Sequence, residues 1–234
     1  MKTPLLLLFI LIGYSDLSAQ DSTVVTIKAG SKVSDVLTQA DIYYYPKFIY
    51  SKIFFKDGTM ADPYMNYNRL YDQMLFINTK GDTLALDDEK TIDFIVNDWD
   101  IFYYDAGYLR LIAGDSDVKL AEKQTWVVAD VRKMGTHNTP KNTVAITSMS
   151  SYTDGHDAAK SKDLILNEEI LLRKETQYYF GNAYNHFVLA GKKRILNLFP
   201  KEQRRIENYL QENKVNFDKK DDLEKLTQFL SQLY

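Results

Sequence analysis

Cysteine is absent from this 234-residue sequence, and histidine occurs only three times. The chain therefore cannot form a disulfide, use a thiol nucleophile, bind a metal through thiolates or carry a lipid on an N-terminal cysteine. Three histidines are also too few for a histidine-rich metal site. We expect no cofactor and no metal, and we expect a protein that is not a lipoprotein.

An excess of one charge is missing as well. Lys and Arg together number 29, Asp and Glu number 32, and the net charge is −3. This balance excludes a strongly basic nucleic-acid-binding chain and a long acidic tail, so we expect no nucleic-acid partner. The composition is 45% hydrophobic and 13% aromatic, which provides enough apolar side chain to bury a core.

Long hydrophobic runs are absent except at the N-terminus. Residues 1–19 have the pattern of a secretory signal peptide, with Lys2 before an apolar core at 5–14 and Ala19 before the expected cut. That apolar core is too short to cross a bilayer of roughly 30 Å as a helix. An uncleaved membrane anchor is the alternative. After cleavage the chain begins at Gln20 and has no membrane span.

The sequence also lacks N-glycosylation sites of the Asn-x-Ser/Thr type. An exported chain without these sites and without cysteine fits a bacterial envelope better than a eukaryotic secretory route. We therefore predict a secreted protein that is periplasmic or associated with the cell surface.

Short β-prone runs separated by turn residues dominate the region from 42 to 112. Asp57-Gly58 indicates a hairpin turn, because glycine accepts a positive φ without steric conflict. Pro63 lacks an N–H and is expected at a sheet edge or bulge. Such short strands, at about ten-residue spacing, predict an antiparallel β-sheet sandwich or partly open barrel. The expected strands are 50–55, 59–67, 74–77, 82–86, 92–96, 99–104 and 108–112.

Before and after this region the pattern is more varied. Residues 23–27 are expected to form a strand, and residues 32–39 a short helix with Val33, Val36 and Leu37 on one face. Residues 118–131 are expected to form one long strand or two. The polar stretch 134–163 is expected to form a long loop, and residues 164–180 again have the pattern of a strand.

The last fifty residues have the spacing of helices. Pro200 suits the first position of a helix, and residues 213–217 form a break. An aspartate at 218, 221 or 222 is expected to cap the final helix, whose apolar stripe must pack on the β-rich part. The fold class is therefore α+β. The expected parts are a signal peptide (1–19), a β-rich domain (20–185) with its polar loop, and a C-terminal helical segment (186–234).

Several of these stretches resemble a family of uncharacterised exported proteins of Bacteroidota. The resemblance lies in Tyr45-Pro46-x-Phe48, in residues 52–59 and 70–86, and in the tail at 193–200 and 209–217. The resemblance implies export and a small body of strands and helices. It implies no activity, because the shared motifs are turn and packing patterns.

Tyrosine is the most conspicuous residue type, with 17 copies, ten of which lie in the strand region between residues 42 and 112. Tyrosines anchor interfaces and stack on sugars, although they also suit half-buried strand faces. We predict that an aromatic face binds an envelope protein, a glycan or a small apolar ligand. The candidate binding residues are Tyr43, Tyr44, Tyr67, Tyr71, Tyr103, Tyr104 and Tyr108.

Catalytic motifs are absent: there is no G-x-S-x-G elbow, no phosphate-binding glycine loop and no H-E-x-x-H. The leading hypothesis is therefore an exported cell-envelope binding or scaffold protein without catalytic activity. A barrel-like carrier of a small hydrophobic ligand is the alternative, and it requires an internal cavity. A hydrolase that uses His137 and His156 in the polar loop is a weaker alternative.

Overall fold

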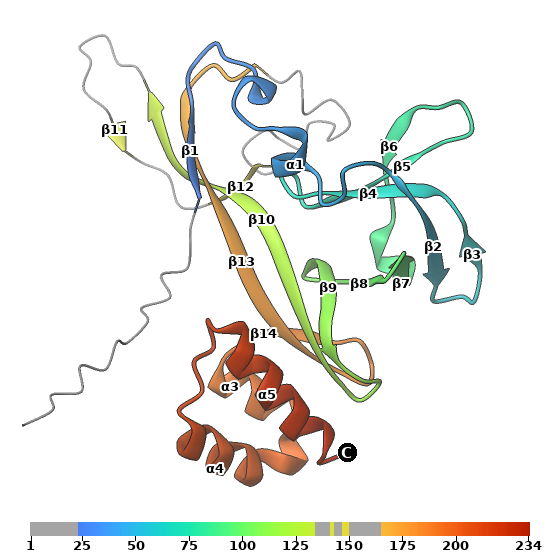
Figure 1. Ribbon diagram of the computed structural model, residues 1–234, viewed down its shortest axis with the longest axis vertical. Helices are drawn as coiled ribbons and strands as arrows, with labels where there is room; N and C mark the ends of the chain where they lie inside the picture. The colour runs from blue at the N-terminus through green and yellow to red at the C-terminus, as the bar shows by residue number, and fades with distance from the viewer. Residues whose placement is uncertain (1–22, 134–140, 143–146, 150–164) are drawn as a thin grey trace, which may run out of the picture.

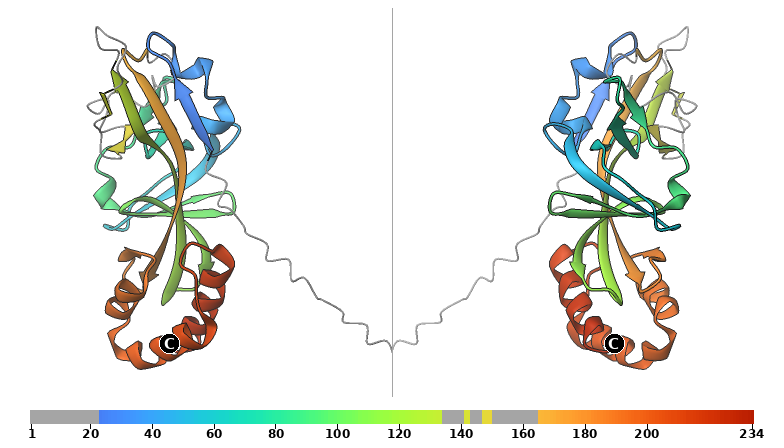
Figure 2. Two further views of the ribbon diagram at one scale, coloured as in Figure 1. Left: turned by 90° about the vertical axis from the view of Figure 1, so that its left-hand side faces the viewer. Right: turned by 90° about the vertical axis from the view of Figure 1, so that its right-hand side faces the viewer.

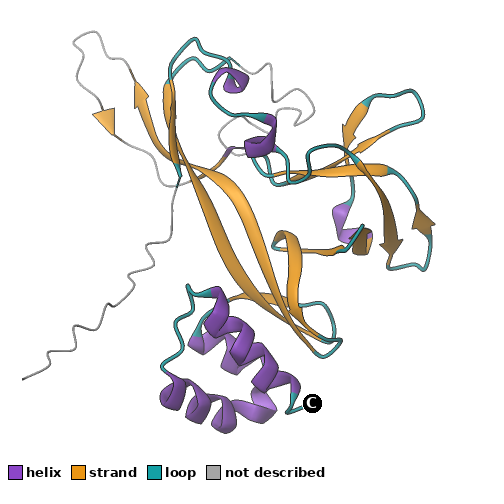
Figure 3. Cartoon of the chain, in the orientation of Figure 1, coloured by secondary structure: helices purple, strands orange, loops and turns teal. Residues whose placement is uncertain are grey.

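The computed structural model describes residues 23–133, 141–142, 147–149 and 165–234. It is an α+β protein: a largely antiparallel, open β-sheet is followed by a C-terminal helical segment (Figures 1 and 3). The expected fold class is thus confirmed. The predicted signal peptide (1–19), most of the predicted loop (134–163), His137 and His156 lie outside the described residues.

The elements follow one another in a simple order. The strands are β1 (Val24–Ile27), β2 (Ile49–Phe55), β3 (Met60–Ala61), β4 (Tyr64–Asn68), β5 (Gln73–Ile77), β6 (Thr83–Ala85), β7 (Ile92–Asn97), β8 (Asp100–Asp105), β9 (Gly107–Gly114), β10 (Val118–Lys133), β11 (Lys141–Asn142), β12 (Thr147–Ser148), β13 (Glu169–Asn182) and β14 (Phe187–Leu189). The α-helices are α1 (Gln39–Ile42), α3 (Lys192–Leu198), α4 (Gln203–Asn213) and α5 (Lys220–Ser231). Three short 3-10 turns are η1 (Val33–Asp35), η2 (Glu89–Thr91) and η4 (Pro200–Glu202).

The long antiparallel pair of β10 and β13 runs along the length of the molecule (Figures 1 and 2). The sheet order is β1-β13-β10-β9-β8-β7-β2-β4-β5-β6. The sheet is strongly curled, since the β13–β14 turn and the start of β14 contact β7 and β8, which lie four and three strands away from β13 in that order. There the Asn185 side chain donates to Asp93 at 2.9 Å, and the Phe187 N–H donates to Asp105 at 2.7 Å.

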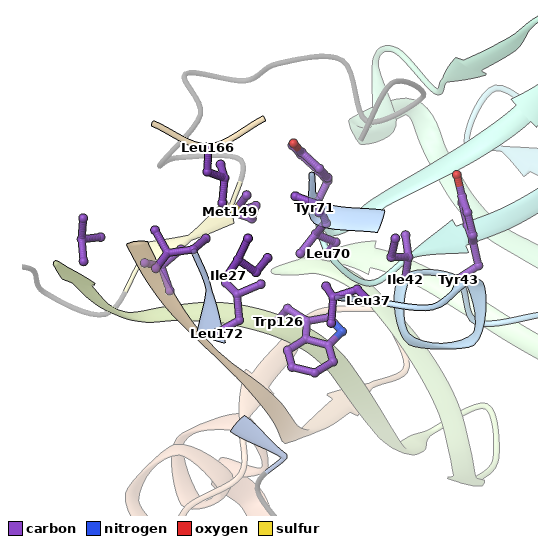
Figure 4. Close-up of a cluster of buried hydrophobic side chains, with 14 of the residues drawn as sticks. Ile27, Leu37, Ile42, Tyr43, Leu70, Tyr71, Trp126, Met149, Leu166 and Leu172 are labelled. Carbon is purple, nitrogen blue, oxygen red and sulfur yellow. The ribbon is translucent and has the colours of Figure 1, made fainter. Parts of the chain in front are cut away.

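An upper core, shown in Figure 4, lies where β1, β10 and β13 meet the turns around α1. Trp126 is its largest fully buried side chain, and its indole N–H donates to the Asp41 carbonyl at 3.0 Å. Thr38 caps α1 by accepting a hydrogen bond from the Asp41 N–H. This contact fixes α1 over the sheet, so a tryptophan on β10 positions a segment 85 residues earlier in the chain.

A second core fixes the helices to the sheet at the lower end of Figure 1. Val118 and Leu120 of β10 and Phe180 of β13 meet the apolar faces of all three helices. Leu223, Leu226 and Leu230 of α5 are fully buried there, as their helical spacing predicted. A helical segment that would be marginal in water is therefore held by tertiary packing.

Most predicted strands and turns are confirmed. Gly58 and Gly81 occupy hairpin turns with φ of 85° and 88°, values that favour glycine. Residues 118–131 form one long strand rather than two, with a bulge between Val128 and Asp130. Pro200 stands at the first position of η4, and Lys214, with φ of 47°, ends α4 in the expected break.

Four local predictions were wrong. The expected helix at 32–39 is a 3-10 turn followed by α1, and Val36 is exposed because the turn leaves it outside the upper core. The expected strand 59–67 is interrupted at Pro63, which cannot donate to a ladder. Trp99 lies in the β7–β8 turn instead of in β8. No aspartate side chain caps α5.

We expect Leu226→Ala to lower the free energy of unfolding by about 2–5 kcal/mol, because it leaves a cavity between α5 and β10. Gln228→Ala, on the exposed side of the same helix, should stay within about 0.5 kcal/mol of the wild type. Urea unfolding followed by tryptophan fluorescence measures both. Equal effects of the two substitutions would show that α5 is not packed on the sheet through the face that carries Leu226.

Candidate functional site

One face of β10 changes from apolar to polar and back to apolar. Val118 and Leu120 belong to the helical core, and Trp126 and Val128 belong to the upper core. Because side chains alternate along a strand, these four share a face with the residues between them. The residues of that face are, in order, Val118, Leu120, Glu122, Gln124, Trp126 and Val128. The two polar residues therefore mark a stretch of sheet that neither core covers.

A groove of about 590 Å³ lies beside this polar stretch; Gln124 lines it, while Glu122 is buried and does not. In register, Gln124 of β10 lies opposite Thr176 of β13, with Lys174 and Tyr178 on either side of Thr176. The α4–α5 connection contributes Phe217 and Asp218 to the lining. The full lining is Thr23, Gln124, Arg173, Lys174, Glu175, Thr176, Gln177, Tyr178, Leu189, Ala190, Phe217 and Asp218.

The outer edge of β13 is open inside this groove. On that side β1 pairs with residues 170–173 and β14 pairs with residues 179–181. Beyond these ladders, the Lys174 N–H donates to Thr23 and the Tyr178 carbonyl accepts from Ala190. Backbone groups alternate in direction along a strand, so the N–H and C=O of Thr176 also face outward. Among the described residues, neither group has a backbone partner on that side.

The charges around the groove are mixed. Burial, together with the positive charge of Arg69, lowers the pKa of Lys174, and the carboxylates of Asp41 and Glu122 partly offset this. Arg173 and Glu175 also line the groove. A groove with amide, hydroxyl and charged groups of both signs suits a ligand that makes many hydrogen bonds, such as a peptide backbone.

Gln124, which lines the groove, donates to Glu122 at 3.3 Å, and Glu122 belongs to a larger hydrogen-bonded network. Arg110 donates to Glu122 through Nε at 3.1 Å and Nη2 at 2.5 Å, and to Asp100 through Nη1 at 2.8 Å. The Tyr45 hydroxyl donates to the other oxygen of Asp100 at 2.6 Å. The Tyr44 ring lies 5.4 Å from the Arg110 guanidinium and 5.7 Å from that of Arg69. This network ties β8, β9 and β10 to the chain before β2.

The seven predicted binding tyrosines lie elsewhere. Tyr43, Tyr67, Tyr71, Tyr103 and Tyr108 are buried core residues, while Tyr44 and Tyr104 are half-buried. None of the seven lines the groove, whereas Tyr178, which we did not single out, does. The polar interruption in the alternating patterns of 118–128 and 172–180 is the sequence signal that marks this site.

Beside Tyr67 and Tyr108, Asp72 and Lys123 form a half-buried ion pair. The Tyr67 hydroxyl donates to Asp72 at 2.7 Å, and Lys123 donates to the Ala106 carbonyl at 2.8 Å. Burial raises the pKa of Asp72, although Lys123 opposes this. A shifted carboxyl can be catalytic, but Asp72 and Lys123 line neither the groove nor the space of about 10 Å³ beside Tyr67 and Tyr108.

The remaining polar features give no metal site. The exposed His186 has Nδ1 3.5 Å from Asp105, and within the described ranges no three His, Asp or Glu residues are grouped to hold a metal ion. In the same part of the chain, no helix has the length and apolar character needed to span a bilayer.

Comparisons of the chain with protein-family models, with curated proteins and with solved structures found no significant match. The site is therefore interpreted from its own geometry.

Asp72 and Asp57 should give opposite pH dependences. A folded-state pKa above the unfolded value means that protonated Asp72 favours the fold, and this contribution is lost as the pH rises through the folded-state pKa. The stability difference between wild type and Asp72→Asn should therefore increase as the pH falls from neutral towards the unfolded pKa.

Hydrogen bonds from Thr59 lower the pKa of the exposed Asp57, so its contribution is present above the unfolded pKa and lost as the pH falls. The stability difference between wild type and Asp57→Asn should therefore decrease over the acidic range. Urea unfolding at several pH values measures both variants. If the two stability differences changed with pH in the same direction, the opposite pKa shifts assigned to Asp72 and Asp57 would be contradicted.

Proposed function

We propose that this protein is an exported binding module of the cell envelope, without catalytic activity, and that it holds a short extended segment of a partner protein in the groove beside β13. The open edge at Thr176 carries this proposal. Unpaired backbone groups at a sheet edge are a template for one more strand. Proteins that bind extended peptides commonly use such an edge.

The size of the opening sets the size of the bound segment. Residues 174–178 of β13 lie between the stretches that pair with β1 and β14. Lys174 and Tyr178 have outer backbone partners in Thr23 and Ala190, which leaves residues 175–177. At about 3.4 Å per residue this gap admits a short extended stretch or the end of a chain. Because β1 and β14 stand on either side, the edge is recessed, and a second folded sheet is a poor fit. A single extended chain is the better occupant.

The side chains around the edge supply further contacts. Tyr178 and Phe217 offer aromatic surface, and Gln124 and Gln177 offer amide donors and acceptors. Main-chain pairing provides affinity in this mode, while such neighbouring side chains select among sequences.

The competing functions receive less support. A carrier of a small apolar ligand needs an enclosed apolar cavity, but the 590 Å³ space is an open polar groove and the space among the core tyrosines is about 10 Å³. The hydrolase hypothesis rests on His137 and His156, which lie outside the described residues. A glycan would also find hydrogen-bonding groups in the groove, and the next experiment separates it from a peptide.

Thr176→Pro should weaken peptide binding without unfolding the protein. Proline removes the outward N–H that a bound strand needs, while the ladder between β13 and β10 uses the neighbouring residues. Peptides selected from a random display library on the wild type should bind Thr176→Pro at least about tenfold more weakly, because at least one backbone hydrogen bond is lost. Thr176→Val keeps the backbone and should bind like the wild type.

Three outcomes contradict this prediction. Equal peptide affinity of the proline and wild-type proteins would remove the edge from the binding mode. Selection of glycans rather than peptides in a parallel array would assign the groove to carbohydrate. If a protein that begins at Thr23 bound the peptides far more tightly than one that begins at Gln20, the residues before Thr23 would compete for the edge. The edge would then be assigned to these residues instead of to a partner.

Export is tested separately. If residues 1–19 are a signal peptide, the protein recovered from the envelope of its own cells should begin at Gln20 or within a few residues of it. Mass spectrometry of the intact protein measures this. Recovery of chains that still begin at Met1, and only from the cytosol, would contradict export.

A further inference from the structure

The helical end of the molecule has a charge opposite to that of the whole chain. Residues 186–205 contain six Lys or Arg residues and one acidic residue, Glu202, for a local charge of +5. Since the net charge is −3, the rest of the chain carries −8. We call the exposed cations of this region the basic surface; they are Lys192, Lys193, Arg194, Lys201, Arg204 and Arg205.

These cations are largely free of acidic partners. Arg205 lies 3.3 Å from Glu202, three residues before it. In the described part of the chain, none of the other five lies within 4.0 Å of a carboxylate. The positive charge of the basic surface is therefore not neutralised inside the molecule and is available to an anionic partner.

The basic surface is held in a fixed shape. The inner sides of its helices are anchored in the helical core by Ile195, Phe199 and Ile206, all buried. The Gln203 amide also donates to the Leu196 carbonyl at 3.1 Å, which joins the start of α4 to the end of α3. The cations are thus presented by rigid elements.

Two shallow hollows lie next to each other on this surface. One, of about 320 Å³, is lined by Lys192, Lys193, Leu196, Asn197 and Gln203. The other, of about 240 Å³, is lined by Arg194 and His186 among others, and it shares Asn197 with the first. Both are open, and the cations are spread over two helices. This arrangement suits a layer of many anionic groups better than one compact anion.

An aromatic side chain lies near the same surface. The ring of Tyr234, which is 55% exposed, contacts the ring of Phe199 with centroids 5.7 Å apart, and Phe199 is followed by Pro200 and Lys201. Tyrosine is favoured at the boundary between lipid and water, where its ring enters the headgroup layer and its hydroxyl stays hydrated.

From these observations we infer that the basic surface docks on a bilayer rich in anionic phospholipids. The recognised group is the phosphate of the headgroup, and binding is peripheral. Figure 2 shows the helices gathered at one end of the long axis, so docking through them leaves the other end of the molecule away from the membrane. This inference uses none of the groove residues and is independent of the proposed function.

Vesicle co-sedimentation tests the inference with the protein that begins at Gln20. It should bind vesicles of phosphatidylcholine with phosphatidylglycerol, bind pure phosphatidylcholine weakly, and lose binding as salt is raised. Each cation near such a surface is worth about fivefold in partitioning. The triple variant Lys192→Glu, Lys193→Glu, Arg204→Glu should therefore bind about a hundredfold more weakly or worse.

A matched control has the same change in net charge. Lys28→Glu, Lys47→Glu, Lys80→Glu alters three exposed lysines outside the helical end and should bind within about threefold of the wild type, because distant charges are screened by salt. Circular dichroism confirms that both variants fold. Equal losses in the two variants, or equal binding to both kinds of vesicle, would overturn the inference. Full competition by millimolar inorganic phosphate would also overturn it, by assigning the surface to free phosphate.

Discussion

The continuous pairing of β10 with β13 is the constraint on which the rest of the structure depends. Fourteen register pairs hold the two strands together, from Val118 with Asn182 to Arg132 with Glu169. The same face of this pair supports the upper core at one end and the helical core at the other. Glu122 and Gln124, in the middle of this face, are polar and belong to neither apolar core. The groove exists because one continuous strand pair supports two separate cores.

The polar network behind the groove explains how the protein accommodates so many charged and hydroxyl groups near its centre. A buried charge is tolerated only when it is paired and hydrogen-bonded. Arg110 meets this condition with two carboxylates, and Tyr45 and Tyr67 each donate to a carboxylate. Asp72, Asp100 and Glu122 therefore serve structural ion pairs.

Local chemistry made much of the fold predictable. Asp57-Gly58 and Asn78 to Gly81 encode hairpin turns by themselves, and the leucine spacing of 223–230 encodes a helix with one buried face. Which tyrosines are buried and which are exposed was not predictable in this way. Tyr103 and Tyr108 lie on opposite faces of neighbouring strands, yet both are buried, because the sheet curls and the β13–β14 turn closes over one side. The open edge depends on where β1 and β14 stop, and that is decided by contacts distant in sequence.

The pairing of β1 with β13 has a kinetic consequence. Val24 lies opposite Arg173, so the first strand of the main sheet pairs with a residue 149 positions later in the chain. Contacts of such high sequence separation form late, because the intervening chain must first be ordered. During synthesis, β1 emerges long before its partner. The main sheet of this chain therefore stays incomplete until β13 has been synthesised.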